Sequence, residues 1–150
     1  MRIYLDKQTP SVYKALTALS AELKARAADV GVPRITLELV NVRVSQINQC
    51  VFCLDLHSRL ALEAGETQQR LALLPAWRET TLYTAKERAA LALAEAVTQV
   101  ADTHISDDDY AAARVDLSDD EVSVITWAAI TINTFNRVSI LSDHPIQRRA

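Results

Sequence analysis

Residues Glu38 to His57 read E-L-V-N-V-R-V-S-Q-I-N-Q-C-V-F-C-L-D-L-H, and they combine helical periodicity with a group of reactive side chains. Cys50, Cys53 and His57 follow one another at positions i, i+3 and i+7. On an α-helix with 3.6 residues per turn, this spacing places all three side chains on one face. The stretch therefore predicts a helix that carries two thiols and an imidazole side by side.

The rest of the chain has the same helical character. The expected helices span residues 10–30, 33–47, 49–64, 67–74 and 84–100, a short segment opening at 106 and a long one from 118 to about 141. Asn48 is a good N-cap for the helix with the cysteines, and residues 76–83 are expected to be a connection. Thr84 with Glu87, and Ser118 with Glu121, have the spacing of capping boxes.

Composition favours an all-α fold. Ala and Leu dominate, Gly occurs twice, and no segment alternates β-branched with polar residues as a half-buried strand would. A chain of 150 residues typically buries roughly 70% of its unfolded surface, which is enough for a core without disulfides. No linker, repeat or low-complexity tract divides the sequence, so residues 1–150 are predicted to form one helical domain.

Charge and hydropathy exclude several classes of partner. The 16 Lys and Arg are interleaved with 19 Asp and Glu, for a net charge of -3, which argues against a nucleic-acid surface. Residues 1–10 lack the apolar stretch of a signal peptide, and the nearly uncharged run 122–136 is too short and polar to span a membrane. We therefore expect a soluble, cytoplasmic protein.

In a reducing cytoplasm, a lone Cys-x-x-Cys pair is more often redox-active or metal-binding than a structural disulfide. Cys50 and Cys53 fall near a predicted helix start, where unpaired N–H groups and the helix dipole stabilise a thiolate. His57 can take a proton from the Cys53 thiol, and Glu38 can orient that imidazole from the preceding helix. These parts suit a thiol peroxidase or a disulfide reductase.

Three other interpretations of these residues remain open at this point. Buried free cysteines are common in protein cores, so the pair can simply be packing. A zinc site would use both thiols and His57, with His104 or His144 as the fourth ligand. Glu38 taken alone is more typical of an ion pair than of a proton relay.

Other polar and aromatic residues are assigned packing roles. Trp77 is expected to anchor the segment after Pro75, and Asn133 with Arg137 to brace neighbouring helices. The same bracing role is expected for Asn136. His104 and His144 flank helix ends and are predicted to be exposed.

The pattern of Glu38, eleven residues, then C-x-x-C-x-x-x-H resembles the alkylhydroperoxidase D-like family of the carboxymuconolactone decarboxylase superfamily, in its short single-domain subgroup. The likeness runs from about Pro33 to Leu141. It includes S-Q-I-N-Q-C (residues 45–50), W-R-E-T (77–80), K-E-R-A-A-L-A-L-A-E-A-V-T (86–98) and I-N-T-F-N-R (132–137).

The resemblance implies an all-helical fold that forms homo-oligomers (a dimer, trimer or hexamer) and an activity that reduces hydrogen peroxide or an organic hydroperoxide. Cys53 would attack the peroxide, Cys50 would resolve the sulfenic acid, and His57 with Glu38 would move the proton. A thiol or dithiol, from a small molecule or a protein, would restore the pair. No metal, haem or flavin is implied.

The sequence departs from the family at Phe52. Members with established peroxidase activity carry a second His immediately before the second Cys, so Phe52 predicts slower turnover. The alternative function is therefore a redox-sensing or binding module in which the Cys50–Cys53 pair switches slowly. Decarboxylase members lack the Cys pair, which disfavours lactone decarboxylation here.

Overall fold

The computed structural model describes residues 1–149, and within them every regular element is a helix. The elements are α1 (Leu5–Gln8), α2 (Pro10–Val30), α3 (Arg34–Ile47), α4 (Val51–Glu63), α5 (Gln68–Leu73), the 3-10 helix η1 (Leu74–Glu79), α6 (Ala85–Thr98), α7 (Asp107–Asp116) and α8 (Asp119–Ser142). The predicted all-α class is confirmed. No helix in this part of the chain is long and apolar enough to cross a membrane.

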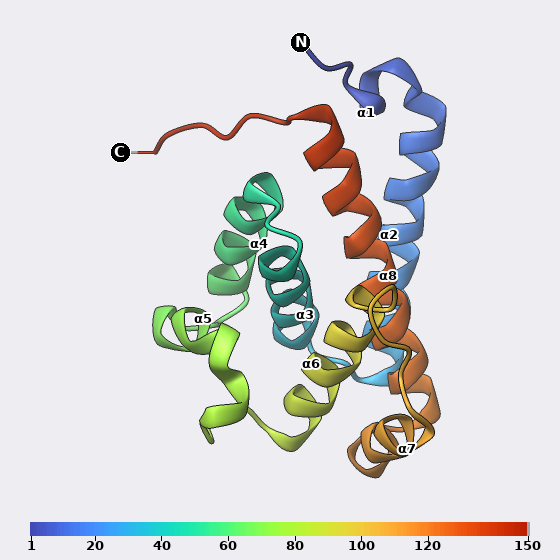
Figure 1. Cartoon of the computed structure of the whole chain (residues 1–150), viewed down its shortest axis with the longest axis vertical. Coiled ribbons are helices and arrows are strands. Elements are labelled where there is room, and N and C mark those ends of the chain that lie inside the picture. Colours follow the sequence, from blue (N-terminus) through green and yellow to red (C-terminus); the bar gives the residue numbers. More distant parts are fainter. Residues whose placement is uncertain (150) are drawn as a thin grey trace.

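Helix α3 lies at the centre of the arrangement, in contact with α4, α6 and α8 (Figure 1). The long α8 runs beside α2 on one side of the molecule and brings the end of the chain back to α1. Both termini therefore lie at the same end of the molecule, near the tip of α8 (Figure 1). Hydrogen bonds from Leu5 N–H to Ser142 Oγ and from Arg2 to Ile140 O hold the first residues against the end of α8.

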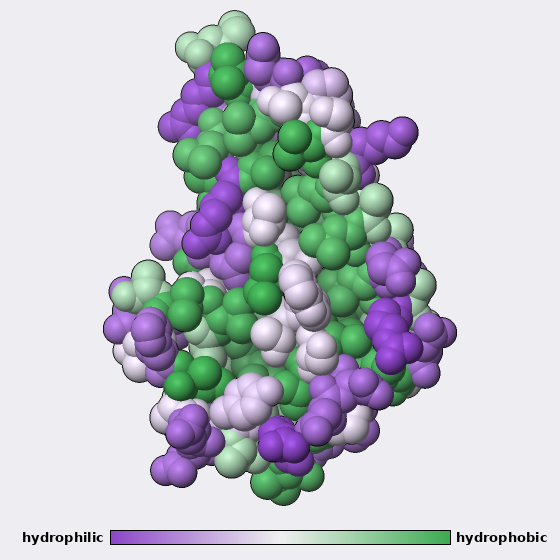
Figure 2. All heavy atoms as spheres, turned by 90° about the vertical axis from the view of Figure 1, so that its right-hand side faces the viewer, coloured by the Kyte–Doolittle hydropathy of each residue, from purple (hydrophilic) through white to green (hydrophobic). Residues whose placement is uncertain are grey.

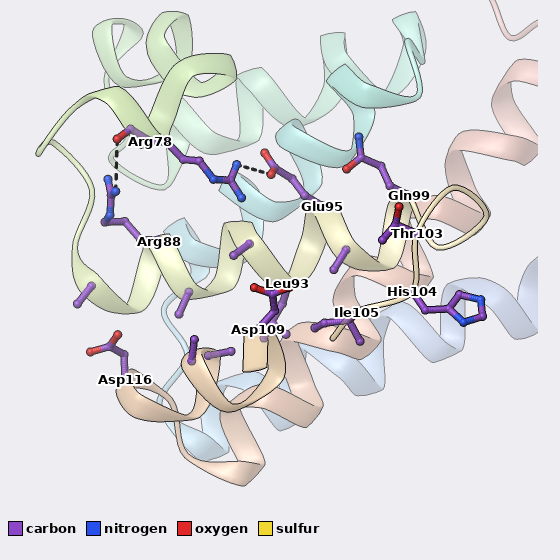
Figure 3. A pocket seen from close by; sticks show the side chains of 16 residues that line it. Arg78, Arg88, Leu93, Glu95, Gln99, Thr103, His104, Ile105, Asp109 and Asp116 are labelled. Atoms are coloured by element: carbon purple, nitrogen blue, oxygen red, sulfur yellow. Dashed lines mark hydrogen bonds and ion pairs between the residues drawn. The ribbon is translucent and has the colours of Figure 1, made fainter. Parts of the chain in front are cut away.

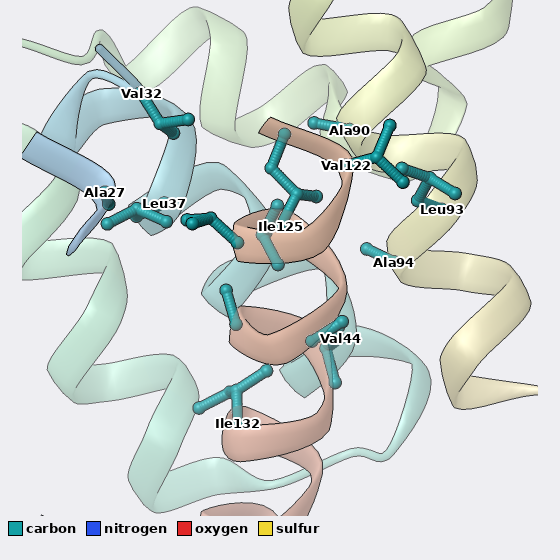
Figure 4. Packing of buried hydrophobic residues seen from close by; sticks show 14 of the residues in the cluster. Ala27, Val32, Leu37, Val44, Ala90, Leu93, Ala94, Val122, Ile125 and Ile132 are labelled. Carbon is teal, nitrogen blue, oxygen red and sulfur yellow. The ribbon is translucent and has the colours of Figure 1, made fainter. Parts of the chain in front are cut away.

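The main core forms where α8 meets α3 and α6. Ile125 and Ile132 of α8 face Val44 of α3, and Ala90 and Leu93 of α6 close the layer (Figure 4). Small residues on α6 let its backbone approach α8 closely, and Ala90 is completely buried. Each buried Ile or Leu stabilises such a core by about 1.5–3 kcal/mol relative to an exposed one.

Local sequence signals set the ends of most helices. The Thr84–Glu87 and Ser118–Glu121 capping boxes are both formed, at the starts of α6 and α8. Gly31 ends α2 in the left-handed conformation, with φ of 83°, where a residue without a Cβ carries no steric penalty. These boundaries agree with the sequence to within about two residues.

Two expectations for the secondary structure are wrong, and one short helix was not expected. Residues 76–83 are not simply a connection, because residues up to Glu79 belong to the 3-10 helix η1. Residues 5–8 form the short helix α1, which the sequence did not suggest. Asn48 is not an N-cap: it ends α3, and Cys50 caps α4 instead.

A buried carboxylate ties three elements together away from the cysteines. Glu95 of α6 accepts hydrogen bonds from Trp77 Nε1 at 2.9 Å and from Arg43 Nε at 2.9 Å, and it pairs with Arg78 at 2.5 Å. Burial of Glu95 opposes its charged form, but these three donors lower the pKa of the carboxyl below its usual value. The packing role predicted for Trp77 is thus supplemented by a hydrogen bond that fixes η1 against α6.

We predict that Glu95→Gln lowers the free energy of unfolding by about 3 kcal/mol at pH 7, since it leaves two arginines without their buried counter-charge. Because the pKa of Glu95 is lowered in the fold, its contribution is present above the unfolded pKa and is lost as pH falls through the folded value. Urea unfolding at pH 7 and at pH 3 measures both effects.

The matched control is Glu63→Gln, since Glu63 pairs with Arg59 on the surface and should contribute less than about 1 kcal/mol. Equal losses of stability in the two variants would contradict a structural role for the Glu95 cluster.

Candidate active site

The turn between α3 and α4 positions the first thiol. Gln49 adopts the left-handed conformation with φ of 55°, and this reverses the chain within two residues. The Cys50 N–H then donates to Ser45 O at 3.0 Å, and the Cys50 sulfur accepts the N–H of Cys53 at 3.3 Å. Cys50 is therefore the N-cap of α4, and Cys53 lies in the first turn of that helix.

The two free thiols form an unequal pair. Cys50 donates a hydrogen bond to the Cys53 sulfur, and this bond is the main reason that the pKa of Cys53 is lowered to about 6. Burial of Cys53 opposes the effect, while side-chain hydrogen bonds from Asn136 and Ser139 and the charge of His57 support it. The same hydrogen bond raises the pKa of Cys50 far above its ordinary value. Cys53 is thus the thiolate at neutral pH.

Asn136 of α8 organises the polar surroundings of the pair. Its Nδ2 donates to Ser45 Oγ at 3.0 Å, and its Oδ1 accepts from Asn48 Nδ2 at 2.9 Å. Asn48 Nδ2 also donates to Asn133 Oδ1 at 2.9 Å. The side chain of Asn136 is completely buried, so these bonds satisfy groups that water cannot reach. The sequence predicted bracing for Asn136 but missed its contact with the Cys53 sulfur.

Glu38 and His57 form a carboxylate–imidazole pair beside the thiols. His57 Nδ1 lies 2.7 Å from Glu38 Oε2, and Asn41 Nδ2 donates to the same oxygen at 3.3 Å. Glu38 is buried with 3% of its surface exposed. A carboxylate at Nδ1 favours the tautomer with its proton on Nδ1, which leaves Nε2 unprotonated and able to accept a proton.

The structure thus brings the four predicted site residues, Glu38, Cys50, Cys53 and His57, into one cluster. A cavity of about 570 Å³ opens onto this cluster, bounded by helices α2, α3, α4 and α8. Cys53 and His57 line it, whereas Cys50 does not. The remaining walls are mostly apolar and include Leu23, Leu37, Leu56, Leu60, Ile132 and Phe135. Of the two sulfurs, Cys53 is therefore the one open to a bound molecule.

A second cavity, of about 480 Å³, lies between α6 and α7 (Figure 3). Its polar residues include Arg78 and Arg88, but Arg78 is paired with Glu95 and Arg88 with backbone carbonyls. His104 is among the residues that line this cavity and is exposed, as predicted (Figure 3). Neither thiol reaches it, so the apolar cavity is the candidate active site.

His144 differs from expectation. It was predicted to be exposed, but its side chain is only 13% exposed and its Nε2 lies 2.9 Å from Asp6 Oδ1. Neither His144 nor His104 joins the cysteines as a ligand: among residues 1–149, no group of three or more His, Cys, Asp or Glu is arranged to hold a metal ion.

Comparison with known proteins places this chain beside several relatives. A family model described as the carboxymuconolactone decarboxylase family matches residues 10–96. The uncharacterized protein YdfG of Bacillus subtilis (strain 168) is 38% identical over 107 residues, which cover 71% of this chain and 73% of YdfG. The uncharacterized protein YnjA of Escherichia coli (strain K12) is 34% identical over 62 residues, which cover 41% of this chain and 34% of YnjA.

A solved structure extends the likeness to nearly the whole chain. The crystal structure of ATU0492 from Agrobacterium tumefaciens superposes with a TM-score of 0.88 at 35% identity, covering 97% of this chain and 99% of that one. ATU0492 is described as a protein of unknown function and as a candidate antioxidant defence protein, AhpD.

We predict that iodoacetamide alkylates Cys53 in the reduced protein with a rate that is half-maximal near pH 6, because the lowered pKa leaves a thiolate at neutral pH. Cys50, whose pKa is raised, should stay unmodified at pH 7. Peptide-resolved mass spectrometry separates the two sites. A Cys53 midpoint near the ordinary thiol value of about 8.5 would contradict the assignment.

A second prediction concerns Asn136. The nearly isosteric Asn136→Asp should place a negative charge beside the Cys53 sulfur and raise the alkylation midpoint by about one pH unit. The matched control is Asn133→Asp, one helical turn earlier, because Asn133 bonds to Asn48 and Thr98 but not to the sulfur. Equal shifts in both variants would show that Asn136 has no direct effect on the thiol.

Proposed function

The chain belongs to the carboxymuconolactone decarboxylase family, and from this membership together with the thiol pair we propose that it is a thiol-dependent peroxidase. The observation that carries the proposal is the asymmetry of the pair. Cys53 has a lowered pKa and lines the apolar cavity, whereas Cys50 has a raised pKa and is shielded from it. An attacking thiolate and a protonated resolving thiol need this difference.

In the first step, the Cys53 thiolate attacks the terminal oxygen of a hydroperoxide. The S–O bond forms as the O–O bond breaks, so that sulfur is oxidised to a sulfenic acid and the peroxide is reduced to an alkoxide. The alkoxide must gain a proton to leave as an alcohol. We assign that proton to His57, which lines the cavity and can deliver a proton taken up at Nε2 while its Nδ1 is held 2.7 Å from Glu38 Oε2.

In the second step, Cys50 attacks the sulfenic sulfur. The raised pKa of Cys50 arises first from its hydrogen bond to the Cys53 sulfur, and that interaction weakens once Cys53 has lost its negative charge. Cys50 then attacks, the S–S bond forms as the S–O bond breaks, and the proton lost by Cys50 joins the departing hydroxide to give water. An external dithiol, small or carried on a protein, reduces the disulfide and regenerates both thiols.

The cavity favours a hydroperoxide with an apolar organic group. Its walls are mostly leucine, isoleucine and phenylalanine, and about 570 Å³ is far more than hydrogen peroxide needs. Burial of such a group also excludes water from the reacting sulfur. Hydrogen peroxide remains a substrate in this proposal, but a slower one.

We also propose that copies of this chain associate through α2 and α8. Two large apolar side chains of α2 lie at the surface: Val12 is 65% exposed and Leu19 is 39% exposed. Trp127 and Ile130 of α8 are also exposed, and Figure 2 shows apolar surface over much of the side where these two helices lie. Exposed apolar area of this kind is typical of subunit interfaces. Light scattering in solution tests for the association.

A second candidate function is a slow redox switch. Cys50 and Cys53 are only 1% and 3% exposed, and Phe52 stands where established peroxidases of the family have a histidine. In this case peroxide would convert the pair to a disulfide once, slowly, and the disulfide would change assembly or partner binding. The two functions differ in the rate at which the protein consumes peroxide when a reductant is present.

We predict that the pre-reduced protein consumes an organic hydroperoxide catalytically with a dithiol, faster than hydrogen peroxide, and that Cys53→Ser abolishes this turnover. Cys50→Ser should stop turnover after one event and accumulate a sulfenic acid on Cys53. A 1,3-diketone reagent followed by mass spectrometry detects that species.

The control is His104→Gln, which changes an exposed imidazole far from the thiols and should keep the full rate. Full turnover in Cys53→Ser would overturn the attacking role of Cys53. A single slow oxidation without turnover, in protein with intact thiols, would favour the redox switch.

A further inference from the structure

A second acid–imidazole pair lies at the same end of the molecule as the thiols, and the proposed reaction does not use it. His144 follows α8, and Asp6 belongs to α1, yet His144 Nε2 lies 2.9 Å from Asp6 Oδ1. Both side chains are largely buried, at 13% and 22% exposure. The His144 ring packs against Phe52 of α4, with centroids 5.4 Å apart, so it lies next to the residue that precedes Cys53.

Ser139 connects this pair to the reacting sulfur. His144 Nδ1 lies 3.3 Å from Ser139 Oγ, one turn back along α8. Ser139 also lines the apolar cavity, is 7% exposed, and makes a side-chain hydrogen bond to Cys53. The four groups therefore form a continuous path from Asp6 through His144 and Ser139 to the Cys53 sulfur.

We propose that His144, held by Asp6, is a positioning residue that accepts the Cys53 thiol proton through Ser139 and stores it while the thiolate reacts. This inference rests on the proposed role of Cys53 as the attacking thiol. It gives the site two separate relays: the Asp6–His144 pair holds the proton taken from the thiol, and the Glu38–His57 pair supplies the proton needed by the leaving alkoxide.

The proton transfer balances without any added group. In the resting thiol form, Nε2–H of neutral His144 donates to Asp6, Ser139 O–H donates to Nδ1, and the Cys53 S–H donates to Ser139 Oγ. The thiol proton moves to Ser139 Oγ and the Ser139 proton moves to Nδ1, while Nε2–H stays on the ring. This yields a Cys53 thiolate that accepts from Ser139 O–H, and an imidazolium whose charge Asp6 compensates. No bond to sulfur other than S–H is broken in this step.

Other charged and titratable groups act on this path from the surrounding elements. The Tyr4 ring meets the His144 ring edge-on, with centroids 5.3 Å apart, and Lys7 lies over the Tyr4 ring. The pKa of Tyr13 on α2 is raised by burial and by the charges of Asp6 and Cys53. The remaining groups are His57 and Glu38. Within residues 1–149, the carboxylate that meets His144 Nε2 at hydrogen-bond distance is that of Asp6.

The experiment measures Cys53 alkylation against pH in the reduced full-length protein, by peptide-resolved mass spectrometry. His144→Gln and Asp6→Asn should each raise the midpoint by about one pH unit, which corresponds to roughly fivefold slower alkylation at pH 6. Ser139→Ala should shift the midpoint in the same direction. Because His144 acts through Ser139, the double variant Ser139→Ala/His144→Gln should shift it no further than the larger single change.

A purely structural role is distinguished by Arg2→Ala. Arg2 Nη1 donates to Ile140 O at 2.8 Å, so this variant also loosens the N-terminus from the end of α8 without touching His144. Loosening alone changes the rate at every pH and leaves the midpoint in place. Unshifted midpoints in His144→Gln and Asp6→Asn, shifts matched by Arg2→Ala, or additive shifts in the double variant would each overturn the proposal.

Alkylation needs no peroxide, so this result is separate from the fate of the proposed peroxidase activity. If the variants shift the alkylation midpoint but the protein shows no peroxide turnover, the proton relay stands and the proposed peroxidase activity is rejected. If the protein turns over peroxide but the midpoints do not shift, the peroxidase activity stands and the relay is rejected.

Discussion

The buried amide of Asn136 is the interaction on which the reactive site depends. It joins α8 to α3 through Ser45 and to the α3–α4 turn through Asn48, with heavy-atom distances of 2.9–3.0 Å. An unpaired buried amide costs about 1–3 kcal/mol, so any slip of α8 against α3 is penalised. That register fixes the turn that carries Cys50 and holds a hydrogen-bond donor against the Cys53 sulfur, which links the packing of the core to the reactivity of the thiol.

Two of the buried carboxylates have different roles: one stabilises the fold and the other lies in the candidate active site. Glu95 binds Trp77, Arg43 and Arg78 in a cluster that fixes η1, α3 and α6 against one another. Glu38 instead meets a titratable imidazole beside the apolar cavity. An arginine holds its charge at every physiological pH and therefore suits a structural pair, whereas a histidine gains and loses a proton near neutrality.

Most of the helical architecture was predictable because its signals act over a few residues. Capping boxes at Thr84 and Ser118, Pro10 at a helix start and Gly31 at a helix end all have the predicted roles. Asn48 shows the limit of such reasoning. Its side chain suits an N-cap, but bonds to Asn133 and Asn136 on a distant helix satisfy it better, and the Cys50 sulfur takes its place at the start of α4.

The sequence by itself determined most of the helices, the family and the grouping of Cys50, Cys53 and His57, because a 3.6-residue repeat brings residues one and two turns apart onto one face. Only the tertiary structure decided which thiol is ionised and what surrounds it. Asn136 and Ser139 reach Cys53 from α8, and Asp6 meets His144 across the two ends of the chain. Such contacts depend on how the helices pack in the folded protein. The spacing of residues along the sequence does not indicate which distant side chains will meet in a buried site.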